Sequence, residues 1–328
     1  MNDSAMDDLS VALVGCGGIA DAYIEAIAEI DGARLVAAVD PDQTARARCS
    51  ERTGAAVYAS LEELPRCDAA LVLTPPNTHE PISCALLANG AHVLCEKPLA
   101  PSIAAADRML TAAQAADRRL MMGSKFRYTP DVASARALLD EGVCGDVVLY
   151  ENVFCSHVDM SKRWNSQPEV SGGGVLIDNG CHSVDLARHL LGPLARVQVQ
   201  FGRRVQDLAV EDTARMLFQS ESGALGSIDL SWSVHKQTDA YVRIIGTRGT
   251  IEIGWQSSRW KPDGGSWQTF GEGYHKVTAF RRQLLDFFNT CRGQSVGVID
   301  DIDAHASVTV IDCAYQAERE DRWVSIPN

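Results

Sequence analysis

The chain has 328 residues, 46% of them hydrophobic and 22% charged; this excludes a wholly disordered protein and predicts about two globular domains. A net charge of −13 argues against general binding of nucleic acids or anionic membranes. No apolar run approaches the ~18 residues of a membrane span, and the acidic stretch 1–10 does not resemble a secretory signal, so we expect a cytoplasmic protein without a membrane partner.

The ten cysteines are scattered singly along the chain. They form no C-x-x-C pair, and no pair of histidines at metal-ligand spacing accompanies them. The sequence therefore predicts reduced thiols and no metal site.

The first 124 residues alternate between short apolar strands and helices. We expect strands at 11–14, 34–39, 69–73, 92–95 and 120–122, and helices at 21–30, 43–53, 81–89 and 102–119. Apolar strands that alternate with helices predict a parallel sheet covered on both faces.

The pattern changes after residue 124, where strands follow one another without intervening helices. We expect strands at 147–157, 196–203, 213–219, 225–234, 240–245 and 249–253, and helices at 130–141, 176–191, 276–291 and 304–319. Strands joined by turns indicate a largely antiparallel sheet. The sequence thus predicts an α/β protein with one domain over residues 1–124 and a second over 125–328.

A glycine-rich turn, G-C-G-G-I-A at 15–20, lies between the first strand and the first helix. This is the G-x-G-x-x-A fingerprint in its strand–turn–helix context. Gly15 permits the tight turn, and Gly17 lets the backbone approach a pyrophosphate. The helix N-terminus offers N–H groups to the phosphates, so Gly15, Gly17, Gly18 and Ile19 are expected to bind a dinucleotide.

Asp40 ends the second strand, 20 residues after Ala20. At that position a carboxylate can accept hydrogen bonds from the ribose hydroxyls, whereas a 2′-phosphate would meet its negative charge. No Arg or Lys occurs between Asp40 and Arg46, so the sequence favours NAD over NADP as cofactor.

Two further strands end in polar segments, T-P-P-N-T-H at 74–79 and E-K-P at 96–98. Open α/β sheets bind ligands at the carboxyl ends of their strands. The residues expected to contact the dinucleotide here are Thr74, Pro75, Asn77, His79, Glu96 and Lys97.

These motifs, together with S-G-G-G-V-L-I-D-N-G-C-H-S-V-D-L-A-R-H-L-L-G at 171–192, resemble the glucose–fructose oxidoreductase/inositol dehydrogenase (Gfo/Idh/MocA) family over nearly the whole chain. The resemblance implies an N-terminal Rossmann domain with a doubly wound parallel sheet. It also implies a C-terminal α/β domain with a large open sheet, whose face forms the contact of a homo-oligomer, a dimer or a tetramer. Lys97 would be a catalytic or substrate-binding lysine beside the nicotinamide, where a cation can polarise a substrate oxygen.

Asp178 and His182 are spaced i, i+4 in the expected helix 176–191, so they project from one helical face, and Asp185 could reach the same side. A carboxylate beside an imidazole holds its tautomer and raises its basicity, which suits a base that takes a hydroxyl proton. A packed histidine with a carboxylate partner is the commoner explanation of this spacing alone. The resemblance implies instead that His182 is the general base and Asp178 its partner. Whether Lys97 or His182 finally accepts the proton is left open.

Several polar and aromatic residues of the second domain are expected to face the substrate. They are Arg127, His157, Asp159, Trp164 and Tyr274, in addition to Asp178 and His182 of the same domain and Lys97 of the first domain. Rings with short polar side chains suit a sugar or a cyclitol. The loop before Pro130 departs from the usual Asn-x-Arg of the family, because Lys125 replaces the Asn.

We expect most tryptophans of this domain, Trp232, Trp255 and Trp323 in particular, to pack the sheet or its oligomer contact.

These features predict an NAD-dependent oxidoreductase that moves a hydride between a ring secondary alcohol of a sugar, amino sugar or cyclitol and NAD, giving a keto-sugar. The acidic composition makes an amino sugar, such as an aminoglycoside precursor, one candidate, with Asp159 and Asp185 lining its pocket. One alternative is a catalytically silent dinucleotide sensor, against which Lys97, Asp178 and His182 argue. Another is an NAD-dependent glycosidase, or a transhydrogenating enzyme that never releases its cofactor.

Overall fold

The computed structural model describes residues 8–327, so the acidic residues 1–7 lie outside the described part. The chain divides into two compact units. The first unit holds the residues up to 100 together with 104–125 and 276–305, and the second holds 101–103, 126–275 and the residues from 306 onward.

The first unit contains a six-stranded parallel sheet in the order β3-β2-β1-β4-β5-β6. Its strands are β1 Leu9–Val14, β2 Ala33–Val39, β3 Ala56–Tyr58, β4 Ala69–Val72, β5 His92–Glu96 and β6 Leu120–Gly123. Its helices are α1 Ala20–Ile27, α2 Gln43–Thr53, α3 His79–Ala88, α4 Ile103–Ala116 and α8 Lys276–Cys291. This strand order is that of the Rossmann fold. From β1, the chain adds β2 and β3 on one side and β4, β5 and β6 on the other, and such sheets bind dinucleotides at the point between β1 and β4 where the order changes.

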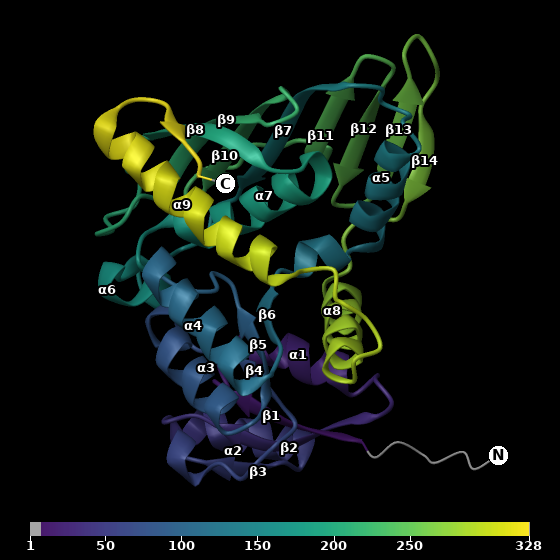
Figure 1. The fold of residues 1–328 in the computed structure, drawn as a ribbon. Helices are drawn as coiled ribbons and strands as arrows, with labels where there is room; N and C mark the ends of the chain where they lie inside the picture. The colour runs from purple at the N-terminus through teal and green to yellow at the C-terminus, as the bar shows by residue number, and fades with distance from the viewer. Residues whose placement is uncertain (1–7, 328) are drawn as a thin grey trace, which may run out of the picture. The chain divides into compact units, whose positions relative to one another are not determined.

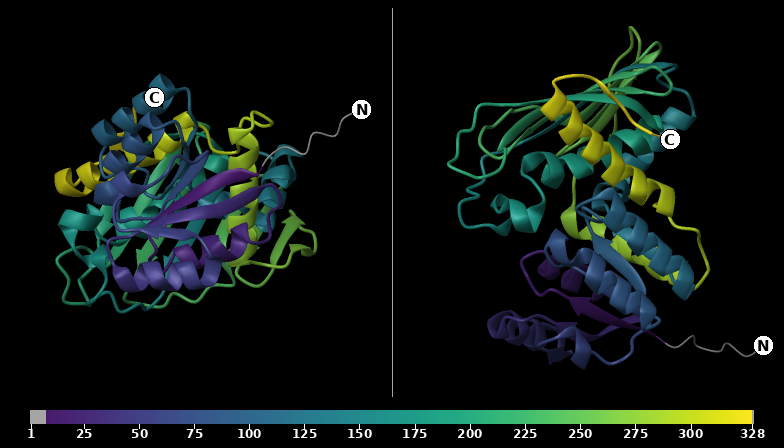
Figure 2. Two further views of the ribbon diagram at one scale, coloured as in Figure 1. Left: turned by 90° about the horizontal axis from the view of Figure 1, so that it is seen from below. Right: turned by 60° about the vertical axis from the view of Figure 1, so that its left-hand side comes forward.

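Burial explains why the strands of the first unit are apolar throughout. Each residue of β4 is fully buried, because α3 and α4 cover one face of the sheet and α1 the other (Figures 1 and 2). The prediction of a doubly wound parallel sheet is confirmed. Strand β3 was not expected, because its three residues are only half-buried or exposed and so carry no apolar signal.

The second unit contains a nine-stranded sheet in the order β14-β13-β12-β11-β7-β10-β9-β8-β15. Its strands are β7 Val147–Cys155, β8 Leu194–Phe201, β9 Thr213–Ser220, β10 Leu225–Ser231, β11 Ala240–Gly246, β12 Gly249–Gly254, β13 Ser258–Pro262, β14 Gln268–Gly271 and β15 Val324–Ser325. Its helices are α5 Pro130–Asp140, α6 Pro168–Ser171, α7 Val175–Leu191 and most of α9 Asp301–Glu320. β7 and β10 pair in parallel and the other neighbours antiparallel, so the prediction of a mostly antiparallel sheet is confirmed.

Helices α5, α7 and α9 cover one face of the nine-stranded sheet and leave the other open (Figures 1 and 2). The strands alternate accordingly. In β9, Ala214, Met216 and Phe218 point into the core, whereas Arg215 and Leu217 lie on the open face. The strands β13, β14 and β15 were not expected, because they are short and mostly half-buried.

The compact units do not coincide with the expected division into residues 1–124 and 125–328, because α8 packs with the first unit. The ring of Phe280 lies 4.6 Å from that of Tyr23 in α1, and Gln283 Nε2 donates a hydrogen bond to the Tyr23 hydroxyl at 3.0 Å. The sequence of α8 indicates that the helix has an apolar face. It does not indicate which of the two sheets that face covers.

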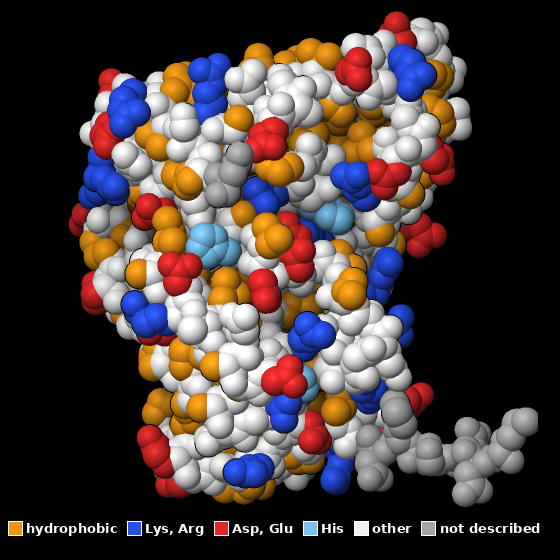
Figure 3. Space-filling model, viewed as in Figure 1, with side chains coloured by type: hydrophobic (Ala, Val, Ile, Leu, Met, Phe, Trp, Pro, Cys, Tyr) orange, Lys and Arg blue, Asp and Glu red, His pale blue; other side chains and the backbone are white. Residues whose placement is uncertain are grey.

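Three observations concern the described residues 8–327 as a set. None of their helices is long and apolar enough to cross a membrane. No three His, Cys, Asp or Glu side chains among them come together in a way that could hold a metal ion. Acidic and basic side chains are interspersed over the face in Figure 3.

Candidate functional site

The glycine-rich turn of the first unit has the geometry that a dinucleotide needs. Gly15 follows β1 with φ +97°, and a Cβ there would lie 2.9 Å from the backbone carbon and oxygen of Leu73. Only glycine fits this position. Nothing lies within 4 Å of the places where Gly17 and Gly18 would carry a Cβ, so their backbone is open to a ligand. The turn therefore fits the pyrophosphate of a dinucleotide at the start of α1.

Asp40 lies directly after β2 and holds this turn. Its Oδ2 accepts a hydrogen bond from the backbone N–H of Cys16 at 2.7 Å, and its Oδ1 accepts one from Asp42 at 2.8 Å. The carboxylate is thus fixed beside the glycine turn, where a ribose would lie.

Two arginines of α2 come closer to this turn than their sequence positions indicated. Arg46 donates to the carbonyl oxygens of Asp40 at 2.6 Å and Pro41 at 2.9 Å, and Arg48 donates to that of Cys16 at 2.8 Å. The first turns of α2 bring them back towards the end of β2, so the gap in basic residues between Asp40 and Arg46 does not leave the region without basic side chains.

His79 links two of the expected cofactor loops. It is fully buried, its Nδ1 lies 2.8 Å from the Pro98 oxygen, and its Nε2 lies 2.8 Å from the Thr74 oxygen. Burial lowers the pKa of the imidazole. His79 therefore connects the segments 74–79 and 96–98, while Asn77 is exposed at the surface.

A buried network surrounds Glu96, the last residue of β5. Its Oε1 accepts from the Tyr23 hydroxyl at 2.7 Å, and its Oε2 accepts from the backbone N–H of Lys97 at 3.0 Å. Burial raises the pKa of Tyr23 well above its ordinary value, so the phenol remains a donor. Glu96 thus fixes the backbone from which the half-buried Lys97 side chain extends.

Helix α7 of the second unit carries Asp178 and His182 one turn apart. Asp178 is half-buried, and His182 is 7% exposed, with its ring edge against Phe126 at a centroid distance of 4.9 Å. Gly180 lies between them, where a Cβ would come within 3.3 to 3.4 Å of Leu230 and Ile311. The helix therefore packs closely on the core while its first turns hold the two candidate residues.

Asp185 and Arg127 form a buried ion pair, which corrects the expectation that Asp185 lines the open side of a pocket. Arg127 Nε lies 2.9 Å from both carboxylate oxygens of Asp185, Nη2 lies 2.7 Å from Oδ1, and the side chains are 2% and 0% exposed. Asp185 therefore cannot line the open side of a pocket. The Arg127 side chain binds Asp185 of α7, and its contact with substrate stays a prediction.

The segment after β7 places His157 and Asp159 at the surface of the second unit. Asp159 accepts from the backbone N–H of Ser161 at 2.9 Å, and hydrogen bonds from Ser161 lower its pKa. Trp164 is 39% exposed. All three side chains are open to solvent in this unit, as a contact with a ligand requires.

An aromatic cluster beside His182 was only partly expected. Tyr274 stacks on Phe126 at 5.1 Å, and Trp255 meets Tyr274 edge-on at 5.7 Å. Trp255 was expected to pack the sheet, but its side chain is 42% exposed and so is only partly packed. Tyr274 was an expected substrate residue, but its contacts with Phe126 and Trp255 could not be predicted, because these residues are far apart in the chain.

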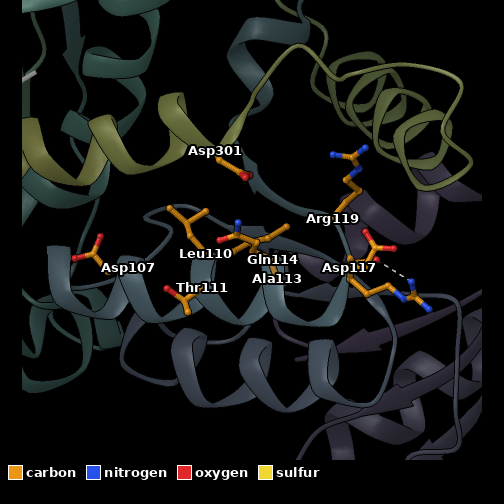
Figure 4. Close-up of a pocket in the computed structure, with 10 residues that line it drawn as sticks. Asp107, Leu110, Thr111, Ala113, Gln114, Asp117, Arg119 and Asp301 are labelled. Carbon is orange, nitrogen blue, oxygen red and sulfur yellow. Dashed lines mark hydrogen bonds between the residues drawn. The ribbon is translucent and has the colours of Figure 1, made fainter.

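The cavities inside each unit lie elsewhere. In the first unit, a cavity of about 630 Å³ is lined by α4, by Leu120 and by Asp301 (Figure 4). Leu120 begins β6, so this cavity lies at the end of the strand opposite to Gly123 and the carboxyl edge. In the second unit, a hollow of about 340 Å³ includes Arg215 and Asp229 on the open sheet face. Neither cavity contains an expected site residue.

Comparison with known proteins matches two regions of the chain to two family descriptions. Residues 9–124 match the oxidoreductase family with an NAD-binding Rossmann fold, and residues 132–252 match the GFO/IDH/MocA C-terminal domain.

Individual relatives agree. A protein of Amycolatopsis mediterranei (strain S699), assigned as an oxidoreductase subunit of UDP-kanosamine synthase, is 32% identical over 74% of both chains. Inositol 2-dehydrogenase of Rubrobacter xylanophilus is 30% identical over 75% of this chain and 71% of its own. Levoglucosan dehydrogenase, solved with NADH and levoglucosan, has the same fold, with a TM-score of 0.90 over 98% of this chain and all of the other at 21% identity. The chain therefore belongs to the Gfo/Idh/MocA family of NAD(P)-dependent sugar and cyclitol dehydrogenases.

Proposed function

We propose that the protein is an NAD-dependent dehydrogenase that oxidises a ring secondary alcohol of a sugar, amino sugar or cyclitol to the ketone. The observation that carries the proposal is the first half of α7, where Asp178 and the nearly buried His182 lie one turn apart beside an aromatic cluster. Family membership and the dinucleotide turn of the first unit support it.

The residues of the first unit fit NAD. Gly15, Gly17, Gly18 and Ile19 would hold the pyrophosphate, and Asp40 the adenosine ribose. Thr74, Pro75, Asn77, His79, Glu96 and Lys97 would form the nicotinamide side, directly or through the loops that they fix. When bound, NAD supplies the acceptor for the substrate hydride.

The protein's own residues handle the proton and the oxygen. His182 takes the hydroxyl proton, and Asp178 holds its tautomer and stabilises the imidazolium. The Lys97 ammonium stabilises negative charge that develops on the substrate oxygen.

The substrate class is proposed from the surroundings of α7. Tyr274 and Trp255 offer ring faces, and His157, Asp159 and Trp164 offer exposed polar and aromatic groups. The relatives named as an inositol 2-dehydrogenase and as an oxidoreductase subunit of UDP-kanosamine synthase support the same class. Because Asp185 is paired with Arg127, an aminoglycoside-like cation would have Asp159 as its exposed partner from the expected pair.

We also propose that the open face of the nine-stranded sheet contacts a second copy of the chain in a homo-oligomer. Leu149 of β7 pairs with Leu225 of β10, and Leu217 lies on the next strand; all three are more than 40% exposed on that face. Exposed apolar side chains on neighbouring strands of one sheet face favour association. Sedimentation of the wild type and of a Leu217→Lys, Leu225→Lys variant tests this, and an unchanged monomer in both would contradict it.

One assay tests the enzymatic proposal. NADH formation is followed at low and high salt with myo-inositol and other inositols, free hexoses, nucleotide sugars and aminoglycoside precursors. We expect turnover with at least one ring alcohol. A cationic substrate should show a KM that rises steeply with salt at nearly constant kcat, because salt weakens encounter more than chemistry. Strong, salt-independent turnover of a neutral cyclitol would exclude the cationic substrate.

Two outcomes would favour the alternatives. Tight NADH binding without turnover of any compound would favour a silent sensor. Purified protein that carries NAD which does not exchange with added NAD would favour a transhydrogenating enzyme or a glycosidase.

A further inference from the structure

Helix α7 lacks an N-cap from its own first residues. Gly174 precedes the helix and has no side chain, and the first amide N–H groups of a helix have no partners within it. A residue far along the chain supplies those partners. The Gly174 and Leu176 N–H groups each donate to Glu211 Oε1 at 3.0 Å, and the Val175 N–H donates to the Glu211 carbonyl oxygen at 2.9 Å.

Glu211 is itself held in place. It is 6% exposed, and the hydroxyl of Tyr315 in α9 donates to the same Oε1 at 2.8 Å. A carboxylate at a helix N-terminus also gains from the helix dipole. Burial raises the pKa of this carboxyl, while the donors around it oppose that rise. Three donors on one oxygen fix its position more closely than a single hydrogen bond would.

The glycines before α7 have no room for side chains because of these contacts. A Cβ at Gly174 would lie 2.0 Å from the Glu211 carbonyl oxygen, and one at Gly173 would lie 2.0 Å from the Tyr315 hydroxyl. The S-G-G-G motif is therefore explained here by close approach to Glu211 and Tyr315.

The capped turn leads directly to the candidate site. The Asp178 N–H donates to the Gly174 oxygen at 3.1 Å, so Asp178 belongs to the turn that Glu211 holds. His182 lies one turn further on, and Asp185 is fixed after it by the ion pair with Arg127. A loosened first turn would thus move Asp178 while His182 stayed in place.

We propose that Glu211 is a positioning residue that sets the place of Asp178 relative to His182. The inference rests on the proposed function, since it assigns the Asp178–His182 pair a part in turnover. It adds a residue that contacts neither substrate nor cofactor and acts through the first turn of α7.

The first test measures the ligand-free protein. Hydrogen–deuterium exchange of peptides that span residues 173–182 is compared in wild type, Glu211→Ala and Val310→Ala. Val310 is a fully buried α9 residue of the same core with no polar contact, so it controls for lost stability. We expect faster exchange in this segment for Glu211→Ala beyond that of Val310→Ala. Equal exchange in the two variants would overturn the inference.

The second test measures kcat with the panel compound that turns over fastest. We expect Glu211→Ala to lower kcat ~10-fold, Glu211→Gln to recover most of it because its amide oxygen still accepts, and Val310→Ala to change it little. The Kd for NADH should not change. The double variant with Asp178→Asn should be no slower than the slower single variant, because both act on one interaction.

The outcomes separate the inference from the proposed function. If Asp178→Asn and His182→Ala both turn over normally, the proposed function fails at this site, and the inference with it. If those variants are slow but Glu211→Ala is as fast as Val310→Ala, or multiplies with Asp178→Asn, the inference alone is wrong. Where Glu211→Ala does not fold, Tyr315→Phe replaces it, with an expected loss of ~3-fold in kcat and faster exchange at 173–182.

Discussion

The two units build their parts of the candidate site in different ways. In the first unit, backbone groups make most of the contacts: the Asp40 carboxylate accepts from backbone N–H groups, and His79 bonds to carbonyl oxygens. In the second unit, side chains hold other side chains and whole helices. Arg127 pairs with Asp185, and Glu211 caps α7 from a distant loop. A motif of a few neighbouring residues encodes the first arrangement, whereas the second depends on the completed fold.

This difference predicts where substitutions cause the most damage. A site built from backbone tolerates loss of many side chains, provided that its glycines remain. A site built from buried charges depends on each partner, because removal of one leaves the other without compensation in a medium of low polarity.

The largest effect on stability is expected at the buried pair in the second unit. Asp185→Asn leaves the Arg127 guanidinium buried without its carboxylate, which should cost about 3–5 kcal/mol in the free energy of unfolding, measured with urea. Turnover should fall as well, because α7 loses an anchor.

The matched control is an exposed pair of the first unit. Arg52 contacts Asp21, and their side chains are 39% and 44% exposed. Asp21→Asn should therefore change stability by less than about 1 kcal/mol. If Asp21→Asn and Asp185→Asn lowered the free energy of unfolding equally, burial would not explain how much each ion pair contributes to stability.

The same contrast explains which features could be predicted from sequence. The turn at Gly15, the acid Asp40 and the spacing of Asp178 and His182 are local patterns whose geometry follows from strand and helix periods. The core strands carried an apolar signal and were found, whereas β3 and β13 are short and half-buried and were not.

Long-range side-chain contacts could not be predicted. Nothing in the sequence pairs Arg127 with Asp185 rather than with a substrate, since an arginine near a site fits both roles. Trp255 and Glu211 contact residues that are far from them in the sequence. No motif of neighbouring residues therefore marks either position. The packing of α8 on the first unit has the same origin.

The second prediction compares one candidate residue from each unit. Lys97→Ala and His182→Ala should each lower kcat by roughly 10²-fold or more, about 2.7 kcal/mol of transition-state stabilisation, because both act on the reacting oxygen or its proton. The Kd for NADH, from fluorescence titration, should remain nearly unchanged. Near-normal turnover of His182→Ala would show that His182 is not the general base and only packs against Phe126.

The third prediction separates two glycines of one turn. Gly15→Ala forces a Cβ against Leu73 at φ +97° and should cost about 2 kcal/mol of stability. Gly17→Ala has open space around it, so its stability should stay within about 0.5 kcal/mol of wild type while the Kd for NADH rises. Thermal unfolding and NADH titration measure both. Tight NADH binding by Gly17→Ala would remove Gly17 from the cofactor site.

The smallest expected effect concerns the Asp40 side-chain charge in the first unit and its influence on the choice between NADH and NADPH. Asp40 should make the wild type prefer NADH over NADPH by at least ~10-fold, about 1.4 kcal/mol, because a 2′-phosphate would lie against its carboxylate. Asp40→Asn removes the charge, so it should narrow the preference. Its single amide oxygen can still accept from the Cys16 N–H, while the hydrogen bond from the Asp42 N–H is lost. Asp40→Ser with Pro41→Arg should narrow the preference further by adding a cation.

Arg46 already donates to the Asp40 and Pro41 carbonyl oxygens, and its positive charge is the one that could weaken the preference for NADH in the wild type. Fluorescence titrations with both cofactors measure the two Kd values. Equal affinity of the wild type for NADH and NADPH would mean that Asp40 does not set a cofactor preference, with Arg46 the side chain placed to offset its charge.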